Sequence, residues 1–506
     1  MASRSGSSLK DVLHSTAGRI GFVAVNSVTG MITARTLHSA GRGELAALGV
    51  WPNFLGGLLT FGLPSALIFW SRRHPDQQSS FLWAALPLAL VAGALAAVTG
   101  MLGMPYWLAQ YSPYVIHMAQ LFMFNVFIVL MIAVARAACE SEGDFLASSV
   151  ALVMPSVLAL CGLLVLSVLH RLTPVTGAIA YILSGVPACF FLLLRLWQSF
   201  QRPPSDIVKR SRQLLGYGIR SYGVDICGTL SIYADQAIVI QLLNPEAMGT
   251  YVVALSLSRV IGVVHQGVAA VLFPKAVALK PHDLIATTGR AVRISTFCSF
   301  IAGVGVALFG PALLSLFYGR EYREATGMLD VLILEMIVTG ATLVLTRPHM
   351  AMGRPGAVTI LQSSGLALSI PLLLLLVPRF GVMGASYALL AASTLRFLLC
   401  LASFRLVLRI GMPGLRLRSS DFSALANRVL SMSKRNPEAE LWEPSHAVTL
   451  ASGGSDATDE YLRFLPYQSA DGPPAPRRWS GGLSFHSQHG RTGPSTSRSH
   501  HKSQDQ

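Results

Sequence analysis

Several polar and ionisable residues lie inside long apolar stretches of this sequence, where such side chains are rare. Arginine guanidinium groups bind anions, whereas carboxylates and imidazoles hold cations or exchange protons. Inside a bilayer each charge costs roughly 2.5–3.5 kcal/mol, so each group must face a partner or water. The candidates for binding a substrate are Arg19, Asn26, Arg220, Arg259 and Arg396, and the candidates for a coupling ion or a salt bridge are Asp225, Asp235, His265, Asp330 and Glu335.

The composition indicates that these apolar stretches lie in a membrane. Of 506 residues, 52% are hydrophobic and only 12% are charged, whereas a soluble protein has about 25% charged residues. This composition argues against a soluble enzyme. The net charge of +15 comes mainly from short links between apolar runs, which is typical of the cytoplasmic side of a membrane protein. We therefore expect a bilayer partner and no nucleic acid.

Twelve segments are long and apolar enough to cross a bilayer core of about 30 Å. Links rich in Pro and Gly separate them, and we expect all of them to be helical because lipid offers no partner for backbone groups. Tight links are expected at 42–44 and 244–246. The predicted spans are 12–36, 45–70, 81–104, 114–136, 146–169, 174–197, 214–242, 248–273, 291–317, 326–346, 356–377 and 382–408.

The basic residues also predict the orientation and the domain division. Lys and Arg concentrate in alternate links, and this bias places both termini in the cytoplasm. A basic linker at 198–213 separates an N-terminal six-helix bundle, 1–197, from a C-terminal six-helix bundle, 214–408. Residues 409–506 are rich in Ser, Gly and Pro, which predicts a largely disordered cytoplasmic tail.

The buried charges have two interpretations. They can pair internally, for example Arg259 with Glu335, and hold helices in register. Alternatively, Arg19 and Arg220 with the other arginines line a shared cavity, where guanidinium groups suit phosphate. The sequence contains no motif for catalysis, a metal or a cofactor, so we expect a transporter rather than an enzyme.

Three stretches resemble the polysaccharide-repeat (Wzx-like) flippases of the multidrug/oligosaccharidyl-lipid/polysaccharide exporter superfamily. Their order and spacing along the spans carry the resemblance, which covers about residues 10–408. The stretches are 34–46 with FGLPSA at 61–66, LGYG at 215–218 with ADQ at 234–236 and MGTY at 248–251, and LFYG at 316–319 with 321–325.

This resemblance implies a fold and an activity. The fold would be two six-helix bundles in a MATE-like V around a central cavity. The activity would be translocation of undecaprenyl-diphosphate-linked oligosaccharide across the bacterial inner membrane for exopolysaccharide, O-antigen or capsule synthesis. Polymerase and export machinery would be further partners. Two alternatives remain open, a multidrug exporter of the same superfamily and a membrane scaffold for a glycan assembly complex that uses the tail.

Overall fold

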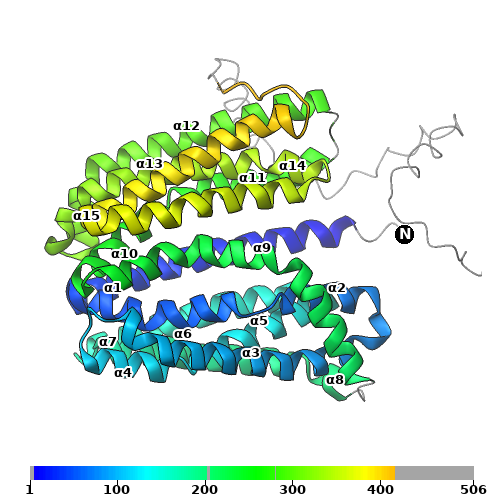
Figure 1. Ribbon diagram of the computed structural model, residues 1–506, viewed down its shortest axis with the longest axis horizontal. Coiled ribbons are helices and arrows are strands. Elements are labelled where there is room, and N and C mark those ends of the chain that lie inside the picture. Colours follow the sequence, from blue (N-terminus) through cyan, green and yellow to red (C-terminus); the bar gives the residue numbers. More distant parts are fainter. Residues whose placement is uncertain (1–4, 202–205, 278, 280, 416–506) are drawn as a thin grey trace, which may run out of the picture. The chain divides into compact units, whose positions relative to one another are not determined.

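The computed structural model describes residues 5–201, 206–277, 279 and 281–415, and this part of the chain is helical apart from short links (Figure 1). The predicted tail lies outside the described residues from 416 onward. The helices of the first part of the chain are α1 (Ser5–Leu58), α2 (Leu63–Arg73), η1 (Pro75–Gln77), α3 (Gln78–Trp107), α4 (Pro113–Phe122), α5 (Asn125–Glu142), α6 (Phe145–Val168), α7 (Pro174–Arg195) and α8 (Trp197–Gln201).

The second part of the chain continues with long helices broken by shorter ones. Its first helix begins within the segment that the sequence assigns to the linker. The elements are α9 (Ile207–Leu242), α10 (Pro245–Arg259), α11 (Gly262–Val277), α12 (Pro281–Leu313), η2 (Leu314–Tyr318), η3 (Arg320–Ala325), α13 (Thr326–Leu345), α14 (Arg347–Ala351) and α15 (Pro355–Leu406).

Local capping chemistry explains where several helices begin. The Asn244 side chain accepts a hydrogen bond from the Ala247 backbone N–H, with Pro245 as the first helical residue of α10. Thr173 caps α7 in the same way, ahead of Pro174. These residues satisfy backbone N–H groups that the first helical turn leaves without partners, and proline lacks one of those groups.

The number of spans is compatible with the predicted twelve. Among the described residues, seven helices are long and apolar enough to cross a membrane, and three bent pairs bring the number to ten. The backbone also leaves helical geometry at His38 within α1 and at Gly381 within α15. Dividing these two helices at their kinks gives one further span each.

The first turn lies earlier than the sequence indicates. The chain reverses at His38, which has φ 59° and ψ −179°, and Arg42, Gly43 and Glu44 are helical residues of α1. The predicted tight link at 42–44 is therefore wrong. Gly43 is needed for packing instead of for a turn, because a Cβ there would overlap the carbonyl oxygen of Pro245. Arg42 consequently lies inside the helical bundle.

The two halves of the chain meet closely around His38. We call this end of the bundle the kink end. There the His38 Nδ1 lies 3.3 Å from the Glu321 Oε1, and the Tyr322 hydroxyl donates to the Ala34 carbonyl oxygen at 3.5 Å. A Cβ on Gly249 would overlap the carbonyl oxygen of Ser39. Figure 1 shows α1 beside α9 and α10, and a large apolar core runs across this contact.

A second close contact joins α2 and α9. Gly62, at φ 68°, precedes α2 and lies so near Gly218 that neither position has room for a Cβ. Nearby, the rings of Phe69 and Tyr217 stack with centroids 4.1 Å apart, and Trp70 Nε1 donates to the Gln213 carbonyl oxygen at 3.1 Å. The first part of α9 is therefore fixed against the N-terminal half of the chain.

Candidate functional site

Two of the predicted arginines flank breaks in the helices. Arg220 and Asp225 lie on either side of a 53° bend within α9, and Arg259 ends α10 just before a 43° bend into α11. The 15 residues of α10 rise roughly 22 Å, so its break lies within the span. Broken helices of this kind form the ion and substrate sites of many transporters.

The guanidinium groups at these breaks form no salt bridge with a carboxylate of the described residues, although the charge of Arg259 acts on the nearby Asp235 carboxylate. Arg220 and Arg259 are both exposed, and neither forms an ion pair or hydrogen bond with any residue that the structure describes. Asp225 is half-buried, also without a partner among those residues. An unpaired arginine within a span must face water or a polar group.

Arg396 belongs to a different environment, a polar network between α13 and α15. Glu335 is buried, and its Oε1 accepts hydrogen bonds from Thr339 at 2.5 Å and Ser393 at 2.7 Å. Arg396 Nη2 donates to the Thr339 hydroxyl at 2.8 Å. Glu335 is thus linked to Arg396 through Thr339 and not paired with Arg259, the partner that the sequence offers as an example.

The remaining candidates are distributed over several helices. The buried Asp235 accepts a hydrogen bond from the Tyr251 hydroxyl at 2.6 Å. Asn26 donates to the Ser156 hydroxyl at 3.1 Å. His265 Nδ1 forms a hydrogen bond with the Ser299 hydroxyl at 3.0 Å. Asp330 is half-buried, and its Oδ1 has no partner among the described residues. The backbone of Arg19 belongs to α1, but its side chain lies outside the described part of the structure.

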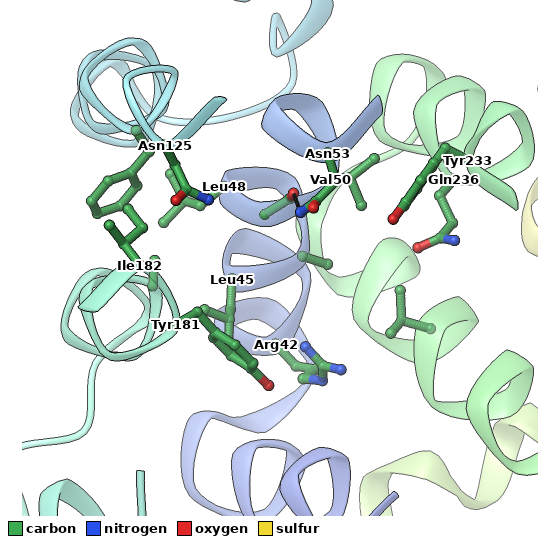
Figure 2. Close-up of a pocket in the computed structure, with 15 residues that line it drawn as sticks. Arg42, Leu45, Leu48, Val50, Asn53, Asn125, Tyr181, Ile182, Tyr233 and Gln236 are labelled. Atoms are coloured by element: carbon green, nitrogen blue, oxygen red, sulfur yellow. Dashed lines mark hydrogen bonds between the residues drawn. The ribbon is translucent and has the colours of Figure 1, made fainter. Parts of the chain in front are cut away.

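A pocket of about 300 Å³ lies near the kink end. Its walls come from α1, α4, α5 and α7 of the first half and from α9 and α10 of the second (Figure 2). None of the residues selected from the sequence lines it. Its polar lining consists of Arg42, Asn53, Asn125, Tyr181, Tyr233 and Gln236.

Most polar groups of this pocket lack hydrogen bonds within the described residues. Arg42 Nε is buried and without a partner. The same residues provide no partner for the side-chain amide of Asn125 or for the hydroxyls of Tyr181 and Tyr233. Buried polar groups are normally satisfied, which makes the buried Arg42 Nε the unusual group here, and the half-buried Asn125, Tyr181 and Tyr233 add open polar groups around it. The pocket is therefore a candidate binding site.

Arg42 is the pocket residue that sequence reasoning misses. Arg42 lies between Gly41 and Gly43, and two glycines so close together predict an external turn. The sequence contains only one weak indication of this pocket. Asn53 lies eleven residues after Arg42, which is three helical turns further along the same face of α1. Recognising that face requires the position of the turn at His38, and the local sequence does not indicate it.

Comparison with known proteins assigns a family to this chain. A sequence model described as "Polysaccharide biosynthesis protein" matches residues 32–327, more than half of the chain. The chain belongs to this polysaccharide biosynthesis family. The family match confirms the resemblance predicted from the three sequence stretches.

A curated relative carries a description consistent with the polysaccharide biosynthesis family. It is the "Probable low-salt glycan biosynthesis flippase Agl15" of Haloferax volcanii, 22% identical over 241 residues. The match covers 44% of this chain and 50% of the relative, so the chain spans about half of the relative's length.

Solved structures similar to this family member share its fold. The lipid II flippase MurJ in an inward closed conformation has a TM-score of 0.66 at 13% identity, over 84% of this chain and 91% of that one. An inward-facing multidrug resistance MATE family transporter has a TM-score of 0.58 at 16% identity, over 77% and 97% of the two chains. A MOP superfamily transporter from Pyrococcus furiosus has a TM-score of 0.56 at 16% identity, over 78% and 95%. The described part of the chain is therefore a helical multi-pass membrane protein with the predicted MATE-like fold.

Proposed function

We propose that this protein translocates a lipid-linked oligosaccharide between the leaflets of a membrane. The observation that carries the proposal is the pair of exposed, unpaired guanidinium groups at helix breaks, Arg220 and Arg259. Guanidinium forks bind phosphate oxygens in bidentate fashion and stay charged in a low-dielectric site. A diphosphate that joins lipid to glycan is the kind of group that such guanidinium forks bind. The polysaccharide biosynthesis family and the flippase description of the relative support this direction.

The proposed substrate is an undecaprenyl-diphosphate-linked repeat unit, carried across a bacterial inner membrane for exopolysaccharide, O-antigen or capsule. The proposed orientation places both termini in the cytoplasm, because the basic links lie opposite the kink end. The kink end would then face outward. Its close contacts, at Gly43 and Gly249, would seal the outer side while Arg220 receives the lipid headgroup from the inner leaflet.

Complementation of a deletion strain tests this proposal. Arg220→Ala and Arg259→Ala are expected to abolish surface polysaccharide at normal protein level. Arg212→Ala is the matched control, because Arg212 is also exposed and unpaired among the described residues, and it lies on the same segment of α9, Ile207–Gly223, about two helical turns before Arg220. Undiminished surface polysaccharide in both the Arg220 and the Arg259 variants would refute the assignment.

A cation exporter is the second candidate function, and Asp225 favours it. This carboxylate is half-buried beside the bend of α9 and has no partner among the described residues, as a cation site would require. An exporter would raise resistance to cationic dyes when expressed, and Asp225→Asn would remove that resistance. A flippase would leave dye resistance unchanged in both cases.

A further inference from the structure

The pocket near the kink end carries one positive charge, which suits the binding of a single anionic group. Arg42 is the one charged residue among those that line it, and its buried Nε has no partner. A buried arginine nitrogen without a hydrogen-bond partner raises the free energy of a membrane protein unless a ligand or water accepts a hydrogen bond from it. Figure 2 shows the Arg42 guanidinium and the Tyr181 hydroxyl at the same edge of the pocket.

The rest of the lining is neutral and amphipathic. Asn53 donates to the Gly49 carbonyl oxygen at 2.8 Å, which leaves its own amide oxygen free among the described residues. Asn125 and the hydroxyls of Tyr181 and Tyr233 have no hydrogen bonds to those residues either. Amides match the hydroxyls of a sugar, and tyrosine rings pack against its C–H faces while their hydroxyls donate.

We propose that this pocket binds a carboxylate-bearing sugar of the transported glycan, a uronic acid, with Arg42 on the carboxylate and the amides of Asn53 and Asn125 on the ring hydroxyls. This inference rests on the proposed function and adds the class of sugar that the protein selects. A single arginine suits one charge, whereas a diphosphate carries more and calls for several cations. The volume of about 300 Å³ is at the small end of ligand pockets, which fits a sugar rather than a lipid chain.

The pocket is lined by other residues than the proposed diphosphate site, although it lies near Arg259, whose charge acts on the Tyr233 hydroxyl. Arg220 and Arg259 lie at the helix breaks and are absent from its lining. Tyr233 and Gln236 bring α9 to the pocket, so the same helix carries Arg220 before its bend and two pocket residues after it. A glycan held at both places would extend along α9 from its diphosphate to its acidic sugar.

Binding to the purified full-length protein tests the assignment with three probes, D-glucuronate, D-glucose and inorganic phosphate. We expect glucuronate to bind saturably and more tightly than the other two. Arg42→Gln should weaken glucuronate binding about tenfold or more, and Arg42→Lys should restore part of it. Arg171→Gln is the matched control, because Arg171 is exposed in the α6–α7 link and its guanidinium has no partner among the described residues.

Two outcomes would overturn the inference: glucuronate binding no tighter than glucose, or phosphate binding as tightly as glucuronate and equally sensitive to Arg42→Gln. If Arg42→Gln does not fold, Tyr181→Phe and Asn125→Leu serve in its place. Each removes a polar group that makes no hydrogen bond within the described residues, and each should weaken glucuronate binding.

Export of acidic and neutral lipid-linked glycans separates this inference from the proposed function. If the wild type exports both and Arg42→Gln loses the acidic glycan alone, both stand. If Arg42→Gln exports the two glycans equally well, the sugar assignment fails and the flippase stands. If the wild type moves neither glycan but binds glucuronate through Arg42, the flippase proposal fails and the carboxylate site stands.

Discussion

The close contact between Gly249 and Ser39 offers a direct perturbation of the seal at the kink end. An ideal Cβ on Gly249 would lie 2.8 Å from the Ser39 carbonyl carbon and 3.1 Å from the Gly43 nitrogen, and it would overlap the Ser39 oxygen. Backbone atoms cannot rotate away as side chains do. In Gly249→Ala, α1 and α10 must therefore separate by about 1 Å to reach normal contact distance.

Overpacking of this kind costs about 1–3 kcal/mol. Because the cost applies only while α1 and α10 are in contact, it favours conformations that are open at the kink end by about 5- to 150-fold. A cysteine at position 39, where the wild-type serine is 9% exposed, reports this shift through its reaction rate with a membrane-impermeant maleimide. The rate should rise in Gly249→Ala, and glycan export should fall because the seal must close in each cycle.

Gly30→Ala is the matched control for this experiment. Gly30 also lies in α1, and a Cβ there meets nothing within 4 Å, so the maleimide reaction rate should stay at the wild-type value. An unchanged rate in Gly249→Ala would refute the reasoning, because it would mean that the two helices tolerate the added methyl group without separating.

Three further perturbations have defined outcomes. Glu335→Gln should lower the stability of the purified protein by about 1–3 kcal/mol, because Arg396 loses the carboxylate to which Thr339 links it; an unchanged thermal unfolding temperature would contradict this. Hydrogen bonds from the Ala147 N–H and the Arg195 guanidinium lower the pKa of Asp144 despite its partial burial, which alone would raise it. The stabilisation from Asp144 is therefore complete above its unfolded pKa of about 3.9 and is lost as the pH falls through the lower folded pKa. Thermal unfolding of Asp144→Asn, which keeps the helix cap, should match the wild type at the acidic end and fall below it at neutral pH; the opposite trend would contradict the assignment. Truncation after 415 keeps the hydrogen bond from Arg293 Nη1 to the Gly414 carbonyl oxygen and should preserve glycan export, whereas loss of export would favour the scaffold hypothesis.

The fold follows from local signals in the sequence. Apolar runs of membrane-spanning length leave the backbone no alternative to helix, and the pairs at 173–174 and 244–245 cap their own helices through contacts only three residues away. The link predicted at 378–381 coincides with the kink at Gly381. Each of these features depends on neighbouring residues alone, so it can be recognised without the tertiary structure.

The site depends on partners far apart in the sequence. Glu335 accepts from Thr339 on its own helix, but its other donor, Ser393, is 58 residues away. The turn at His38 has no glycine or proline to announce it, and moving it by a few residues carries Arg42 from a link into a pocket. Sequence reasoning therefore identifies the polar residues in the spans without identifying which of them meet.

The distribution of lipid-linked glycan between the two leaflets tests the central claim most directly. In a deletion strain that carries the Arg220→Ala, Arg259→Ala double variant, the glycan should accumulate in the inner leaflet, as it does without the protein. Arg212→Ala should restore the wild-type distribution. A wild-type distribution in the double variant, at normal protein level, would show that the unpaired guanidinium groups at the helix breaks do not carry the substrate.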